Sequence, residues 1–132
     1  MPLDASPLSP LQKAIYERLT TNTGRTIYDY VPSGAAYPYV VIGEDTATDW
    51  STKQKHGEEV TSTLHIWSQY RGKAEVKEIA SEIQSAMINP LSLEDGWQAV
   101  SCELDMFRIL DDPDGITKHG VLRFRFRLYK LS

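Results

Sequence analysis

The chain has 132 residues, of which 41% are hydrophobic and 24% are charged, a composition typical of one ordinary globular domain. Its formal net charge of −4 argues against non-specific DNA binding, because such binding depends on lysine and arginine side chains that neutralise phosphates. A single cysteine, Cys102, excludes an intrachain disulfide and a cysteine metal site. No apolar run is long enough to span a membrane, and the start of the chain shows no signal peptide. We therefore expect a soluble single domain over residues 1–132.

The first half of the chain predicts one helix and two strands. Residues 1–9 form a proline-rich lead that we expect to be flexible. Ser9 as the N-cap and Pro10 at the first helical position predict the start of a short amphipathic helix. Strand-like runs then cover residues 27–31 and 40–48.

Between the second and third strands lies a polar and charged segment, residues 49–59, which we interpret as a loop. Loops of about ten residues without secondary structure of their own are often functional or mobile. The loop contains Trp50, Lys53 and Lys55, which are candidates for contacts with a partner.

The second half predicts a strand over residues 60–68, an amphipathic helix over residues 76–87 and a long hairpin. The hairpin joins strands over residues 97–110 and 118–131 through an Asp-Asp-Pro-Asp-Gly turn at residues 111–115. The order α-β-β-β-α-β-β favours an α+β fold, with two helices packed on one face of an antiparallel sheet.

Alternation assigns the two faces of each strand. In the strand over residues 60–68, the core face is expected to carry Val60, Ser62, Leu64 and Ile66. In the next strand, we expect a core face formed by Val100, Cys102, Leu104 and Met106. In the last strand, the apolar face carries Leu122, Phe124, Phe126 and Leu128, and the opposite face carries Arg123, Arg125 and Arg127.

A carboxylate cluster is the first candidate for catalysis, because a nuclease or hydrolase could use it to hold a divalent ion. It comprises Asp111, Asp112 and Asp114, with Glu103 and Asp105 upstream. Aspartates in an Asp-Pro-Asp-Gly turn ordinarily cap the local backbone, so we interpret the cluster as a turn.

The remaining reactive side chains do not form a recognisable site. His56, His65 and His119 are far apart in the sequence and form no HExxH or HxH pair, so we expect ordinary half-buried or surface histidines. Cys102 follows the apolar alternation of its strand and is expected to be a small core residue. We therefore predict no enzyme activity, no metal and no cofactor.

The row formed by Arg123, Arg125 and Arg127 is the most distinctive feature of the sequence. It could be a face paired across the strands with Glu103 and Asp105, a subunit interface, or a nucleic-acid surface. Trp50 and Trp67 are suited to an interface, where aromatic residues are enriched, or to packing at a sheet edge. The candidate interface residues are Trp50, Lys53, Lys55, Trp67, Arg123, Arg125 and Arg127.

Several segments, taken in this order, resemble the tail completion (head–tail joining) proteins of long-tailed bacteriophages and prophages. The resemblance covers most of the chain and is carried by residues 10–16, 27–32, 37–43, 64–68, 72–76 and 123–127.

The resemblance implies an α+β subunit of a ring, a hexamer, that caps the tail tube and joins it to the head connector. DNA would pass through the ring without being read, and an acidic protein suits that task. The protein would be a virion component, present in the host cytoplasm before assembly. A tail terminator that stops tube growth is the alternative within the same class, and a small metal-dependent nuclease using Asp111–Asp114 is the alternative from another class.

Overall fold

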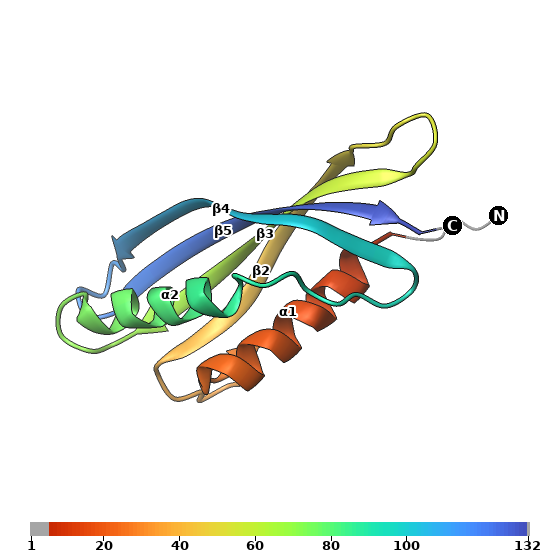
Figure 1. Ribbon diagram of the computed structural model, residues 1–132. Helices are drawn as coiled ribbons and strands as arrows, with labels where there is room; N and C mark the ends of the chain where they lie inside the picture. The colour runs from red at the N-terminus through yellow and green to blue at the C-terminus, as the bar shows by residue number, and fades with distance from the viewer. Residues whose placement is uncertain (1–5, 132) are drawn as a thin grey trace.

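Two helices and five strands follow one another in the predicted order in the computed structural model, which describes residues 6–131. The elements are α1 (Leu8–Thr23), β1 (Ile27–Tyr28), β2 (Tyr39–Asp49), β3 (Gly57–Ser68), α2 (Ala74–Ala86), β4 (Trp97–Asp111) and β5 (Lys118–Lys130). Both helices lie on the same side of one twisted sheet (Figure 1). The α+β prediction is therefore confirmed.

The sheet has the strand order β1-β2-β3-β5-β4, so β5 lies between β3 and β4. All pairs of long strands are antiparallel, and β4 and β5 form the predicted C-terminal hairpin. The run predicted over residues 27–31 contributes only the two residues of β1, which pair parallel with Val40 and Val41 of β2. The sheet is thus antiparallel except at this short edge.

Helix α1 begins earlier than the sequence predicted. Its N-cap is Pro7 rather than Ser9, and the Ser6 hydroxyl accepts a hydrogen bond from the Leu8 amide at 3.1 Å. Pro10 is tolerated in the first turn because the amides there have no partner within the helix. Of the lead predicted over residues 1–9, residues 1–5 lie outside the described part of the chain, and its last two residues belong to α1.

The core lies between the helices and the sheet and follows the predicted periodicities. Its largest fully buried side chains are Phe126, Leu11, Ile15, Leu19, Leu64, Ile66, Ile79, Ile83, Leu122 and Leu128. Helix α2 packs directly on the backbone of β5, since a Cβ atom added at Gly120 would lie 2.6 Å from Val76 Cγ1. A side chain at that position would push the helix away from the sheet.

The alternation predicted for β4 is wrong for Val100 and Met106. The pairing of β4 with β5 shifts between Ala99 and Ser101 and again between Leu104 and Met106. Each bulge inserts one extra residue, and the residues beyond it change face. Val100 is therefore exposed, whereas Met106 lies opposite Arg123 on the side away from the helices.

The loop between β2 and β3 is shorter than the predicted segment over residues 49–59, because β2 extends to Asp49 and β3 starts at Gly57. The Trp50 amide donates a hydrogen bond to the Gly57 carbonyl at 2.8 Å, which continues the strand ladder into the loop. The tip of this hairpin projects beyond the two helices (Figure 1). Mobility of the loop stays a prediction.

Candidate interaction surface

The face of the sheet opposite the helices, called the outer face below, carries the arginine row. Strand alternation places it there, because Leu122, Phe124, Phe126 and Leu128 of the same strand are buried against the helices. The row consists of Arg123, Arg125 and Arg127 in β5, which lies between β3 and β4.

The first two arginines pair with carboxylates of β4. Arg123 Nε donates a hydrogen bond to Asp105 Oδ2 at 2.9 Å. Arg125 lies 3.6 Å from Asp105 and 3.9 Å from Glu103, and its buried Nε has no hydrogen-bond partner in the described chain. Of the three alternatives for the row, these contacts show the pairing with Glu103 and Asp105, which neutralises much of its positive charge.

The third arginine belongs to a cluster at the base of the β2–β3 hairpin, called the hairpin cluster below. Arg127 Nε donates to Glu59 Oε2 at 2.9 Å, and the guanidinium lies 5.5 Å from the Trp50 ring centroid. The Trp50 ring stacks on Tyr129 at 4.7 Å, and Lys55 Nζ lies 5.0 Å from the centroid of the same tyrosine ring. Three of the predicted interface residues are thus brought together.

The other two candidates lie apart from this cluster. Lys53 is exposed in the loop between β2 and β3. Trp67 lies at the opposite end of the outer face, where its ring stacks on His119 with centroids 3.9 Å apart. The seven candidates therefore do not form one compact patch. They extend along the outer face from the hairpin to the end of β3.

Trp67 is part of a histidine cluster that the sequence did not reveal. His65 Nδ1 lies 2.7 Å from His119 Nε2, and His65 Nε2 lies 2.9 Å from Glu44 Oε1. Gly43 leaves room for this arrangement, because an added Cβ would lie 2.6 Å from the His65 ring. The two histidines are 54 residues apart and meet only because β3 pairs with β5. The sequence signal that could have found this pair is that strand alternation puts both histidines on the outer face.

The hydrogen bonds of this cluster indicate which ring nitrogens carry a hydrogen. A hydrogen bond from His65 holds the pKa of Glu44 below its ordinary value, so the carboxylate is ionised and His65 Nε2 carries the hydrogen. In neutral His65, Nδ1 then accepts a hydrogen bond from His119 Nε2–H. Burial, followed by the neighbouring His65, lowers the pKa of His119. The cluster therefore favours neutral His119.

As predicted, the acidic turn is stabilised by hydrogen bonds from an aspartate to the local backbone. Asp114 Oδ1 accepts hydrogen bonds from the amides of Ile116 and Thr117 at 2.7 and 2.8 Å, and Oδ2 accepts one from Thr117 Oγ1 at 2.6 Å. These bonds lower the pKa of Asp114. Gly115 provides the positive φ of 74° that the turn requires. Within residues 6–131, no group of three or more His, Cys, Asp or Glu side chains could hold a metal ion.

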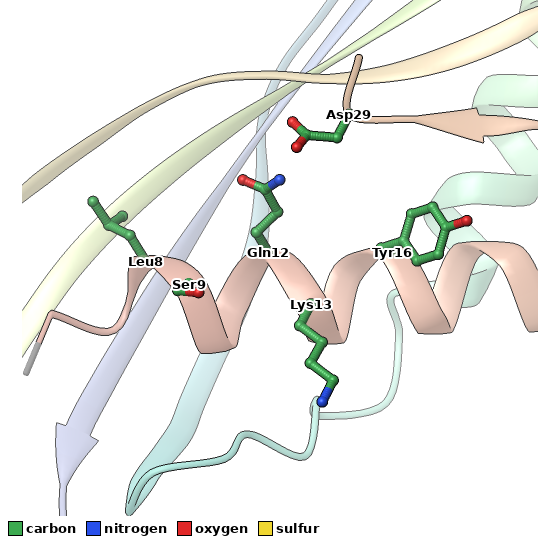
Figure 2. Close-up of a pocket in the computed structure, with 6 residues that line it drawn as sticks. All are labelled: Leu8, Ser9, Gln12, Lys13, Tyr16 and Asp29. Carbon is green, nitrogen blue, oxygen red and sulfur yellow. The ribbon is translucent and has the colours of Figure 1, made fainter. Parts of the chain in front are cut away.

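Neither the cysteine nor the surface depressions provide a catalytic group. Cys102 packs against the core, and burial raises the pKa of its thiol to about 11. Figure 2 shows an open depression on α1, where Gln12 and Asp29 face each other and Lys13 points away. Lys13 donates instead to Glu94 Oε2 at 2.7 Å. These polar groups do not converge on one point, as they do in ligand sites.

The polar side chains of the outer face bond mainly to one another across strands, in an α+β fold with both helices on the other face. The family model for tail completion protein gp17 matches residues 13–129. Tail completion protein gp17 of Bacillus phage SPP1 is 35% identical over 92 residues, which cover 70% of this chain and 68% of the relative. The chain belongs to the tail completion protein gp17 family.

Solved structures agree with this assignment. The structure of the bacteriophage SPP1 gp17 protein matches with a TM-score of 0.60 and 32% identity, over 89% of this chain and 88% of that one. A chain in the virion of a native gene transfer agent particle has the same fold, with a TM-score of 0.84, 24% identity and coverage of 96% and 99%. The resemblance seen in the sequence is confirmed.

The chain is thus a structural tail completion protein and not an enzyme. The nuclease alternative is wrong, and the carboxylate at its centre, Asp114, caps a turn. No helix within residues 6–131 is long and apolar enough to cross a membrane.

Proposed function

We propose that the chain forms a ring, a hexamer, at the head-proximal end of the tail tube and joins the tube to the head connector. The observation that carries this proposal is the match of residues 13–129 to the tail completion family. The likeness of this chain to a chain in the virion of a gene transfer agent is consistent with a position inside such a particle.

The outer face supplies suitable contacts for neighbouring subunits or for the tube. Aromatic and arginine side chains are enriched in protein interfaces, and the hairpin cluster presents Trp50, Tyr129 and Arg127 together. The hairpin projects beyond the helices, so its tip can reach a neighbouring protein (Figure 1). Lys53 and Lys55 add positive charge at this tip.

In this proposal, DNA passes through the ring without being read. A protein of net charge −4 attracts phosphates weakly, and Arg123, Arg125 and Arg127 are already paired with carboxylates. A lumen of this character lets DNA slide through.

The test uses particles assembled in cells that lack the gene for this chain. We expect DNA-filled heads and separate tails, and we expect the purified chain to join them, as seen by electron microscopy. Labelled chain should lie at one end of isolated tubes. Joined particles in equal numbers without the chain would overturn the proposal. Tubes of abnormal length without the chain would instead identify a tail terminator.

A pair of variants tests the role of the hairpin cluster in joining. Trp50→Ala combined with Lys55→Ala should lower the yield of joined particles about tenfold or more, because interface aromatics are often binding hot spots. The matched control is Tyr30→Ala, which removes an aromatic ring that is 85% exposed in the loop after β1. Equal yields from both variants would show that the cluster makes no contact needed for joining.

A further inference from the structure

The strand β4 lies at an edge of the sheet and carries an apolar row on its helix side. It pairs only with β5, apart from an isolated bridge between Ser92 and Gln98 near its start. From Val100 to Asp111, its other edge therefore has no backbone partner within residues 6–131. Unpaired amide and carbonyl groups along an edge are a template for another strand.

The helix layer does not extend far enough to cover β4. Helix α1 packs on β1 and β2, and α2 packs on β3 and β5, so β4 lies at the margin of the helix layer, where its apolar side chains pack against the core on one side and stay partly exposed. The helix side of β4 carries an apolar row in which Cys102, Leu104, Phe107 and Ile109 are half-buried or exposed. On the outer face, Leu110 is exposed as well. The outer face of β4 also carries the charged residues Glu103 and Arg108, so the apolar side chains gather on its helix side.

A second open edge lies on the other side of the same sheet. Strand β1 pairs with β2 only at Val40 and Val41, so no other strand of residues 6–131 pairs with β2 on that side from Gly43 to Asp49. The two open edges are different surfaces, so a contact between them in successive copies runs head to tail. Contacts of this kind generate rings when the rotation closes.

Charge and direction both suit pairing between these edges. Arg108 of β4 is exposed and forms no ion pair within residues 6–131. The open edge of β2 carries Asp45 and Asp49, besides Glu44, which is already bonded to His65. Three antiparallel pairings separate β2 from β4, so these strands run antiparallel. Copies rotated about an axis along the strands keep those directions, and the seam is then an antiparallel pair.

We infer that the open edge of β4 in one copy, Val100–Asp111, pairs with the open edge of β2 in the next copy, Gly43–Asp49. In this arrangement the helix side of β4 faces α1 of the next copy, which packs on β1 and β2. The exposed side of α1 around the depression in Figure 2, which includes Leu8 and Tyr16, is the surface available for this contact. This inference rests on the proposed ring and names the surfaces that form it.

Cross-linking tests the seam in rings assembled on purified tail tubes. In a Cys102→Ser background, Ala47→Cys and Leu104→Cys place one thiol on each edge, and a short bis-maleimide tolerates small differences in register. The double variant should yield a ladder of covalent multimers on a denaturing gel. A mixture of the two single variants should yield dimers and nothing larger. The control pair, Ala47→Cys with Tyr70→Cys, should yield neither.

The outcomes separate this inference from the proposed function. A ring of the expected mass without cross-links between positions 47 and 104 would overturn the seam and leave the ring intact. Strong dimers from Leu104→Cys alone would show a symmetric contact between two β4 strands and also overturn it. Failure to form any oligomer on tubes would remove both proposals.

A charged side chain introduced on the open edge of β4 provides an independent test of the seam. Leu104→Lys should reduce the amount of ring on tubes about tenfold or more, since an inward-pointing charge discourages strand addition. Because Leu104 is 41% exposed, the isolated chain should keep a thermal midpoint close to that of the wild type. Tyr70→Lys is the control for an added charge elsewhere on the surface. Unchanged ring formation by a folded Leu104→Lys chain would contradict the seam.

Discussion

The indole of Trp67 lies flat on the imidazole of His119, with ring centroids 3.9 Å apart and an interplanar angle of 10°. The two residues are directly opposite each other in the pairing of β3 with β5. The stack covers one side of a histidine that also bonds to His65, so His119 is held in position and partly shielded from water.

The first prediction is a pH dependence of stability that arises from His119. Its pKa is lower in the folded chain than its ordinary value, so the unfolded chain binds a proton more readily. The contribution to stability is therefore complete above about pH 6.5 and is lost as the pH falls from about 6.5 toward the lower folded-state pKa. Urea unfolding between pH 7.5 and 5 should show this loss, and NMR titration of the His119 ring should show the lowered pKa.

The control for this prediction is His119→Gln, which should flatten the dependence in that window. A variant that keeps the full slope would show that another group causes it.

The second prediction concerns the ion pair between Arg127 and Glu59, whose atoms lie 2.9 Å apart. Both side chains are partly exposed, so we expect a coupling free energy of about 0.5 kcal/mol. A double-mutant cycle with Arg127→Met and Glu59→Gln measures it through urea unfolding. The coupling should shrink in 1 M salt, because screening weakens exposed charge pairs. A coupling that is unaffected by salt would indicate packing rather than charge.

The third prediction separates a turn from a metal site. Asp114→Ala removes three hydrogen bonds within the turn and should lower the thermal midpoint. Because those bonds lower the pKa of Asp114, its contribution is present above the ordinary aspartate pKa and lost as the pH falls through the folded-state value. Asp112→Ala should cost less, since its one bond to the Asp114 amide is 3.4 Å long. A midpoint raised by added magnesium in the wild type would contradict the turn interpretation.

The fourth prediction concerns the contact between α2 and β5. Gly120→Ala places a Cβ 2.6 Å from Val76 Cγ1, too close for two carbon atoms, so we expect a loss of about 1–3 kcal/mol in the free energy of unfolding. Adding Val76→Ala opens the space again, and the double variant should then be more stable than the sum of the two single losses predicts. Strict additivity would show that the helix does not pack on this glycine.

The fifth prediction concerns the thiol of Cys102. With a pKa of about 11, it should react very slowly with a maleimide at pH 7.5 in the folded chain and rapidly in urea. Leu104→Cys in a Cys102→Ser background is the matched control, because the new thiol lies two residues along the same strand and is exposed. Mass spectrometry measures both rates, and equal rates would contradict the burial of Cys102.

Local periodicity determined the elements of this fold. Apolar residues at helical spacing in α2 and strict alternation in β5 needed no tertiary information, and the Asp-Pro-Asp-Gly turn has its own chemistry. The sequence also contained the arginine row and its carboxylate partners on β4, because opposite charges on a shared face of a hairpin have few other arrangements. The α+β class and the resemblance to tail completion proteins followed from that order of elements.

Only the tertiary structure decided which distant residues meet. A bulge leaves no mark in the alternation before it, so the sequence could not place Val100 and Met106 correctly. His65 and His119 meet because β5 inserts between β3 and β4, a choice that depends on how the whole sheet buries its apolar face. The two helices cover four strands and leave β4 open for the same reason. The edges that we assign to the ring are therefore a property of the packed sheet, whereas the elements that form it are a property of the chain.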